Sequence, residues 1–176
     1  LSFSSIRSGL MIEKILEWLI EESSGIVLTL MGEVSGKWNN DNSKIIEEGI
    51  GRGVLKLEER ISPDQFSVIL PRYDVGLITF ESNCKNHLYC APAKLTDYLH
   101  AGLPILASRL PSLEIYPTQF DFIKLFDSNN KNEFFNQVAC LQKLKDEESR
   151  LRIRKESSIL SWGNEFGKIA HLFKTN

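Results

Sequence analysis

The sequence predicts a doubly wound α/β fold: a Rossmann-like parallel sheet of about six strands with helices on both faces. Short apolar runs alternate with amphipathic helical segments along all 176 residues, and parallel strands need crossover helices of this kind. Several of the runs, such as GIVLTLM at 25–31, have no polar alternation, as expected for strands that are covered on both faces.

The elements follow in order. Helix 8–22 places its apolar residues on one face and its charges on the other, and helix 62–70 has Ser62 as N-cap and Pro63 in the first turn. A third helix starts at Pro92 and ends before Gly102, because glycine takes a left-handed cap and Pro104 cannot continue the helix. A polar loop is expected at 32–42, a short helix at 43–49, and helix from about 131 to the end. Strands are expected at 1–5, 25–31, 53–57, 74–80, 104–108 and, with a weaker pattern, 120–126.

The composition is that of one soluble globular domain. The formal net charge of −2 argues against a nucleic-acid-binding face, which would be basic. No apolar run approaches the roughly 18 residues of a membrane-spanning helix. The chain begins with LSFSS, without an initiator methionine and already inside the first expected strand, which suggests a domain cut from a longer protein.

Three cysteines, an odd number, favour free thiols in a reducing compartment. Cys84, His87 and Cys90 form a C-x2-H-x2-C cluster. A zinc site would need a fourth ligand and a second close pair, neither of which the sequence offers, so the cluster is interpreted as a loop with free thiols and not as a metal site.

The most unusual residue is Lys94, in the first turn of the helix that starts at Pro92. The helix dipole is positive there and disfavours a cation, whereas a phosphate would be attracted both by the free N–H groups and by the lysine. Asp97 follows one turn later and can accept hydrogen bonds from the hydroxyls of a ribose, as carboxylates do in dinucleotide-binding folds. The alternative is an ordinary exposed ion pair that contributes well under 1 kcal/mol.

The segment DVGLITF followed by APAKLTDYLHAGLPILAS resembles the signature of GT-B glycosyltransferases of the group 1 type, specifically their donor-binding domain. The resemblance extends weakly over the whole chain. The residues that fall on the family pattern are Ala91, Pro92, Lys94, Leu95, Asp97, Tyr98, Leu99, Gly102, Pro104 and Ser108.

The resemblance implies that this chain is the C-terminal half of such an enzyme. It would hold a nucleoside-diphosphate sugar, while an absent N-terminal domain would hold the acceptor. Lys94 and Arg7 would stabilise the leaving diphosphate as catalytic residues, and Asp97 would bind the ribose. The remaining donor-site residues implied by the resemblance are Gly32, Arg60, Ile61, Tyr89, Pro92, Ala93 and Leu95.

The sequence departs from the family at two of these places. Glu59 stands where the family usually has glycine, beside the base pocket, and Tyr89 stands where many relatives have a second, sugar-contacting glutamate. His87 and His100 are interpreted as structural or solvent-facing. No D-x-D motif is present, so fixed cationic and N–H donors, without a metal or other cofactor, are expected to stabilise the leaving group.

The leading hypothesis is a cytoplasmic, bacterial or archaeal glycosyltransferase that makes a surface polysaccharide or glycolipid, with membrane contact only through the parent protein. One alternative is a nucleotide-sugar epimerase of the same architecture, although the histidine and paired carboxylates of such enzymes are missing. The other is a non-catalytic flavodoxin-like binding or receiver module. A receiver would need acidic residues after the first strand, and SFSSIRSG has none.

Overall fold

The computed structural model describes residues 2–3, 10–22, 24–33, 35–83, 85–90, 92–161 and 163–164. Its strands are β1 (Ser2–Phe3), β2 (Leu28–Met31), β3 (Leu55–Glu58), β4 (Gly76–Ile78), β5 (Ile105–Ser108) and β6 (Ile123–Phe126). They form two parallel three-stranded sheets, in the orders β1-β2-β3 and β4-β5-β6.

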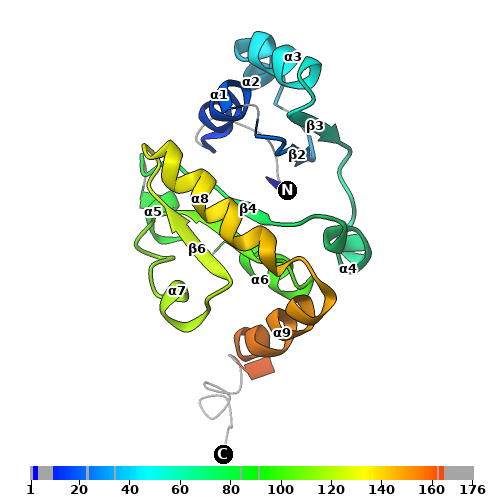
Figure 1. Cartoon of the computed structure of the whole chain (residues 1–176), viewed down its shortest axis with the longest axis vertical. Helices are drawn as coiled ribbons and strands as arrows, with labels where there is room; N and C mark the ends of the chain where they lie inside the picture. Colours follow the sequence, from blue (N-terminus) through cyan, green and yellow to red (C-terminus); the bar gives the residue numbers. More distant parts are fainter. Residues whose placement is uncertain are drawn as a thin grey trace, which may run out of the picture.

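The two sheets meet where β1 lies beside β4, and Figure 1 shows the amino terminus at this place, between β2 and β4. The combined order is therefore β3-β2-β1-β4-β5-β6, and it reverses direction at β1. This is the doubly wound α/β arrangement that the sequence predicts, with its switch point between β1 and β4.

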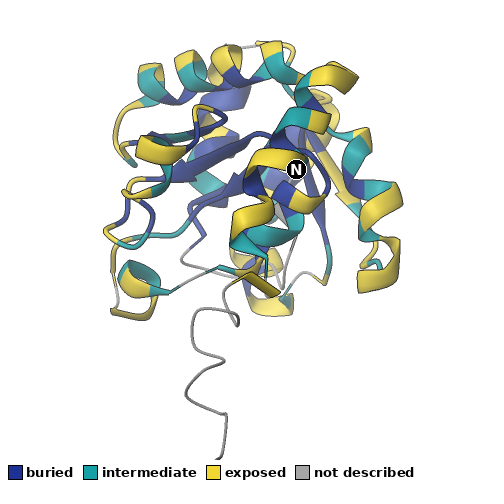
Figure 2. Cartoon of the chain, turned by 90° about the horizontal axis from the view of Figure 1, so that it is seen from below, coloured by how far each residue is buried: buried dark blue, intermediate teal, exposed yellow. Residues whose placement is uncertain are grey.

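The described helices are α1 (Ile12–Glu22), α2 (Gly36–Asp41), α3 (Ser43–Gly51), α4 (Phe66–Ile69), α5 (Lys85–Tyr89), α6 (Ala93–His100), α7 (Tyr116–Gln119), α8 (Lys131–Leu141) and α9 (Glu147–Ser157). Short 3-10 turns flank some of them, namely η1 (Pro63–Gln65), η2 (Leu70–Arg72), η3 (Gln142–Leu144) and η4 (Ser158–Leu160). Figure 2 shows buried strands at the centre and exposed surface on the outer sides of the helices.

Helices cover both faces of the sheet, because successive side chains along each strand point to opposite faces and form an apolar layer on each. Leu77 and Leu106 belong to one apolar cluster, which includes residues of α1 and α8. Their neighbours Ile78 and Ile105 point the other way, into a cluster built with residues of α6 and α9. Successive side chains of a strand lie on opposite faces, so each face needs its own apolar layer.

Several predicted boundaries are corrected by the structure. The polar loop expected at 32–42 contains α2, and the connection before Pro92 contains α5. The helix expected at 62–70 is broken into η1, α4 and η2. β2 starts three residues later than predicted, and β3 starts two residues later. In both cases a glycine turns the chain before the strand, since Gly25 and Gly53 have left-handed φ angles of 72° and 71°. The closing helix expected from Ser161 lies largely outside the described residues.

Candidate functional site

A cleft of about 410 Å³ opens at the carboxyl ends of β2, β3 and β4, beside the switch point. Ligands of doubly wound proteins bind at this place, because the crossover connections diverge there. Its volume lies within the range of about 300–1,000 Å³ that is usual for small-molecule sites. The lining residues are Met31, Gly32, Glu33, Arg60, Ile61, Pro63, Phe66, Phe80, Pro92, Ala93, Lys94 and Asp97.

One wall of the cleft is the first turn of α6, where Lys94 lies. Pro92 is the N-cap of α6 and has no N–H group of its own to leave unpaired. The Lys94 side chain lines the cleft although the residue is only 8% exposed. Burial lowers the pKa of this lysine from 10.5 to about 8. The protein therefore holds a desolvated cation at the positive end of a helix, which is a poor place for a cation and a good place for an anion to bind.

Asp97 lies one turn further along α6 and lines the same cleft. It is half-buried. Burial raises the pKa of its carboxyl group above the ordinary value, and the nearby His100 opposes part of that increase. A partly desolvated carboxylate gains most from hydrogen-bond donors, so Asp97 is suited to accept bonds from hydroxyl groups of a ligand.

The opposite wall comes from the segment that follows β3. Arg60 and Ile61 lead into the η1 turn, and Phe66 begins α4. The turn is fixed locally, because the Gln65 side-chain oxygen accepts hydrogen bonds from both the N–H and the hydroxyl of Ser62, each at 3.2 Å. This wall combines an aliphatic and an aromatic side chain with one guanidinium.

The floor is formed by the residues that follow β2 and β4. Gly32 has a φ of 134°, a conformation that favours glycine, and its N–H donates to the carbonyl of Glu58 at 3.0 Å. Phe80 is held by a hydrogen bond from its N–H to the hydroxyl of Ser108, at 3.0 Å. The exposed residue Glu33 also lines the cleft and brings a carboxylate to it.

Of the residues expected at the donor site, the structure brings seven together in the cleft: Gly32, Arg60, Ile61, Pro92, Ala93, Lys94 and Asp97. Leu95 and Tyr89 do not line it. Leu95 points away because it belongs, with Tyr98 and Leu99, to the buried stripe of α6. Tyr89 is 68% exposed at the end of α5. Arg7 lies outside the described residues.

Five cleft residues are not predicted by the sequence: Met31, Glu33, Pro63, Phe66 and Phe80. The two phenylalanines belong to apolar runs that predict a helix and a strand, and nothing in either run distinguishes a cleft side chain from a core side chain. Glu33 belongs to a segment whose composition predicts only a polar loop.

Within the part of the chain that the structure describes, no group of three or more His, Cys, Asp or Glu residues is arranged to hold a metal ion. The His87 ring lies on Phe80, with centroids 5.1 Å apart, and its Nδ1 is 3.0 Å from the carbonyl oxygen of Glu81. The Cys90 thiol donates to the His87 carbonyl at 3.8 Å, and Cys84 is outside the described residues.

Among the described helices, none is long and apolar enough to cross a membrane.

Solved structures share this architecture at low sequence identity. HepE from Anabaena, in complex with UDP and glucose, superposes with a TM-score of 0.72 and 12% identity over 97% of this chain and 46% of HepE. WaaG, a glycosyltransferase involved in lipopolysaccharide biosynthesis, gives a TM-score of 0.61 and 10% identity over 99% of this chain and 46% of WaaG. OtsA gives 0.63 and 12% over 99% of this chain and 43% of OtsA.

These structures are GT-B glycosyltransferases, and the chain accordingly has the fold of a GT-B glycosyltransferase domain. It spans less than half the length of each of them. No family model and no curated protein matches the sequence.

Proposed function

We propose that this chain is the nucleotide-sugar-binding, C-terminal half of a glycosyltransferase that transfers a sugar from a nucleoside-diphosphate donor. The observation that carries the proposal is the buried Lys94 at the start of α6, in one cleft with Asp97. A nucleoside diphosphate complements both side chains, since it carries anionic oxygens for the lysine and hydroxyl groups for the carboxylate. The UDP and UDP-glucose complexes of the similarly folded HepE support the same class of ligand.

In this proposal the three parts of the nucleotide meet three parts of the cleft. The diphosphate lies at the first turn of α6, against Lys94 and the free N–H groups of the helix. The ribose hydroxyls donate to Asp97. The base lies against the wall formed by Ile61 and Phe66, with Arg60 at its edge.

The reaction breaks the bond between the anomeric carbon of the sugar and the diphosphate oxygen, and the acceptor hydroxyl forms the new bond and loses its proton. The diphosphate leaves as an anion, so the protonated Lys94 stabilises the charge that develops in the transition state. Arg7 is proposed as a second cation for the same charge. Fixed donors of this kind make a metal ion unnecessary for binding.

The acceptor is proposed to be a glycan or glycolipid held by a second, N-terminal domain, with the intact enzyme acting in the cytoplasm on a surface polysaccharide or glycolipid. This chain alone is then expected to bind nucleotides without transferring sugar at an enzymatic rate, because the cleft between two domains is needed for transfer.

Calorimetric titration tests the proposal with UDP, GDP and their sugar conjugates, each with and without a chelator. We expect binding by at least one of them, unchanged by EDTA and at least tenfold weaker in Lys94→Met. Lys143→Met, at an exposed lysine in η3, is the matched control and should bind like the parent. If no nucleotide binds, or if Lys94→Met binds as well as the parent, the site has been wrongly assigned. If EDTA abolishes binding, the metal-independent account fails.

A further inference from the structure

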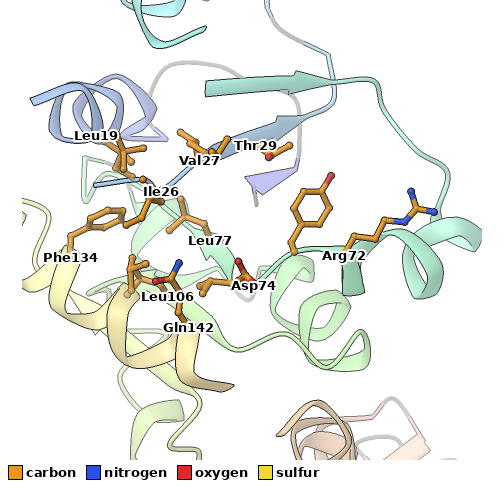
Figure 3. A pocket seen from close by; sticks show the side chains of 16 residues that line it. Leu19, Ile26, Val27, Thr29, Arg72, Asp74, Leu77, Leu106, Phe134 and Gln142 are labelled. Carbon is orange, nitrogen blue, oxygen red and sulfur yellow. The ribbon is translucent and has the colours of Figure 1, made fainter. Parts of the chain in front are cut away.

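Tyr73 lies between η2 and β4 and does not line the nucleotide cleft, but its hydroxyl reaches the strand that leads into that cleft. It donates to the carboxylate of Glu58, the last residue of β3. The same carboxylate forms an ion pair with Lys56 at 2.5 Å. Arg72 is a further cation close enough to act on Glu58, and Figure 3 shows its side chain pointing from the segment before β4 towards the connection that follows β3. The segment before β4 therefore holds the end of β3 by a hydrogen bond and a nearby positive charge.

Glu58 connects two parts of the nucleotide cleft. Its backbone carbonyl accepts the N–H of Gly32, in the floor of the cleft, at 3.0 Å. Shortly after Glu58 in the chain come Arg60 and Ile61, which belong to the wall opposite α6. A shift of Glu58 would therefore move the floor and this wall together.

The wall itself has few other attachments. Within the described ranges, Glu59, Arg60 and Ile61 take part in no backbone–backbone hydrogen bond. Ile61 packs against the apolar cluster that includes residues of α6 and α9. The next fixed point along the chain is the capped turn η1. The position of the wall thus depends on Glu58 at one end and on η1 at the other.

Tyr73 can hold Glu58 in place because its own backbone is fixed. Its carbonyl accepts a hydrogen bond at 2.8 Å from the buried guanidinium of Arg150 in α9, and its N–H donates to the Leu70 carbonyl at 3.1 Å. Its side chain packs against the same apolar cluster as Ile61. Burial and the Glu58 carboxylate raise the pKa of the Tyr73 hydroxyl above its ordinary value, so the hydroxyl remains a donor at neutral pH. Hydrogen bonds to a carboxylate are among the stronger ones in proteins.

We propose that Tyr73 is a positioning residue for the nucleotide cleft, which acts through Glu58 to hold the Arg60–Ile61 wall and the floor at a fixed distance from α6. The ligand named here rests on the proposed function, whereas the positioning of the cleft does not. In the proposed function the base faces this wall and the diphosphate faces α6. Loss of the Tyr73 hydroxyl should therefore weaken the binding of a nucleotide and leave the binding of its diphosphate part unchanged.

The test replaces Tyr73 by phenylalanine, which removes the hydroxyl and keeps the ring. We expect Tyr73→Phe to bind UDP or GDP, whichever the parent binds, at least fivefold more weakly in calorimetric titration. Inorganic pyrophosphate, which has no base, should bind within twofold of the parent. The matched control is Tyr116→Phe, because Tyr116 is a half-buried tyrosine in α7 whose hydroxyl has no hydrogen-bond partner among the described residues. This control should bind all three ligands like the parent.

Amide exchange of the free protein provides a measurement that needs no ligand. In Tyr73→Phe the N–H of Gly32, which donates to Glu58, should exchange at least fivefold faster than in the parent. The N–H of Leu28, which donates to Val54 where β3 begins, should change by less than twofold, and neither should change in Tyr116→Phe. A loss of global stability would accelerate both amides and is distinguished in this way.

The outcomes separate this inference from the proposed function. If no nucleotide binds to the parent but Tyr73→Phe accelerates exchange at Gly32 alone, the proposed function fails and the positioning of the cleft by Tyr73 stands. If exchange at Gly32 is unchanged, the inference fails whatever the parent binds. It also fails if Tyr73→Phe binds the nucleotide like the parent, or if nucleotide and pyrophosphate lose affinity equally, because the hydroxyl would then not act through the wall.

Discussion

Replacing Lys94 by methionine is predicted to stabilise the free protein. The lysine pKa falls from 10.5 to about 8 on folding because the side chain is buried. A difference of this size corresponds to about 3 kcal/mol between the charged and neutral forms, and the burial of the charge costs that amount at neutral pH. Methionine fills a similar volume without a charge. The contacts of Lys94 are lost as well, so about 3 kcal/mol is the upper value of the gain.

The stability gain of Lys94→Met should depend on pH if it comes from removing a buried charge, whereas a gain from better packing should not. Below pH 8 the lysine is protonated in both the folded and the unfolded chain, so the full cost is present. Between pH 8 and 10.5 the unfolded chain binds more protons than the folded one, and the parent gains stability as the pH rises. The advantage of Lys94→Met is therefore largest at pH 7 and shrinks towards zero near pH 10.5.

Urea unfolding of the parent, Lys94→Met and Lys143→Met at pH 7 and at pH 10 measures these differences, because effects of other titrating groups cancel between variants. Lys143 is exposed, so its replacement should change the free energy of unfolding by less than about 0.5 kcal/mol at either pH. A Lys94→Met variant that is less stable than the parent at pH 7, or whose advantage is the same at both pH values, would refute the reasoning.

Three further predictions concern other residues. Asp97→Asn should reduce the preference for ribose over deoxyribose nucleotides, measured as the ratio of UDP to dUDP affinity, because an amide is a weaker acceptor for hydroxyl groups than a carboxylate; an unchanged ratio would remove Asp97 from the ribose site. Gly76→Ala should cost at least about 2 kcal/mol in chemical unfolding, since an added Cβ would lie 2.4 Å from the ring of Tyr98. A Gly76→Ala variant as stable as the parent would mean that the Tyr98 ring moves aside without cost. Arg150→Met should cost about 2 kcal/mol or more, because the buried guanidinium donates to backbone carbonyls, including that of Tyr73 at 2.8 Å; a melting temperature like that of the parent would contradict this.

The order of the strands and main helices could be predicted because apolar periodicity is a local property. β5 is an example, since Ile105–Ser108 is buried throughout and the sequence shows an unbroken apolar run there. α2 could not be predicted in this way, because Trp38 is the only buried residue in its six. That tryptophan is held by a hydrogen bond from its indole N–H to the carboxylate of Glu13 in α1, a contact between segments that no local pattern encodes.

The candidate site likewise has one wall that the sequence predicts and one that it does not. Pro92, Lys94 and Asp97 lie within six consecutive residues, so their spacing on one helix is enough to predict that they share one wall. The opposite wall depends on how the segment after β3 approaches α6 across the switch point. Phe66 and Phe80 come from different connections, and only the folded chain shows that they face the same space.

The buried face and the last turn of α6 explain how the fold tolerates a buried lysine in its first turn. Tyr98 is fully buried in the core beneath the sheet, and at the carboxyl end the Arg154 guanidinium donates to the carbonyl of Ala101 at 3.3 Å. A cation at this end of a helix is favourable, because the dipole is negative there. The helix is thus fixed by its buried face and its last turn, and the first turn does not have to contribute to stability. A buried lysine at the first turn, with its pKa lowered by burial, is therefore compatible with a stable helix.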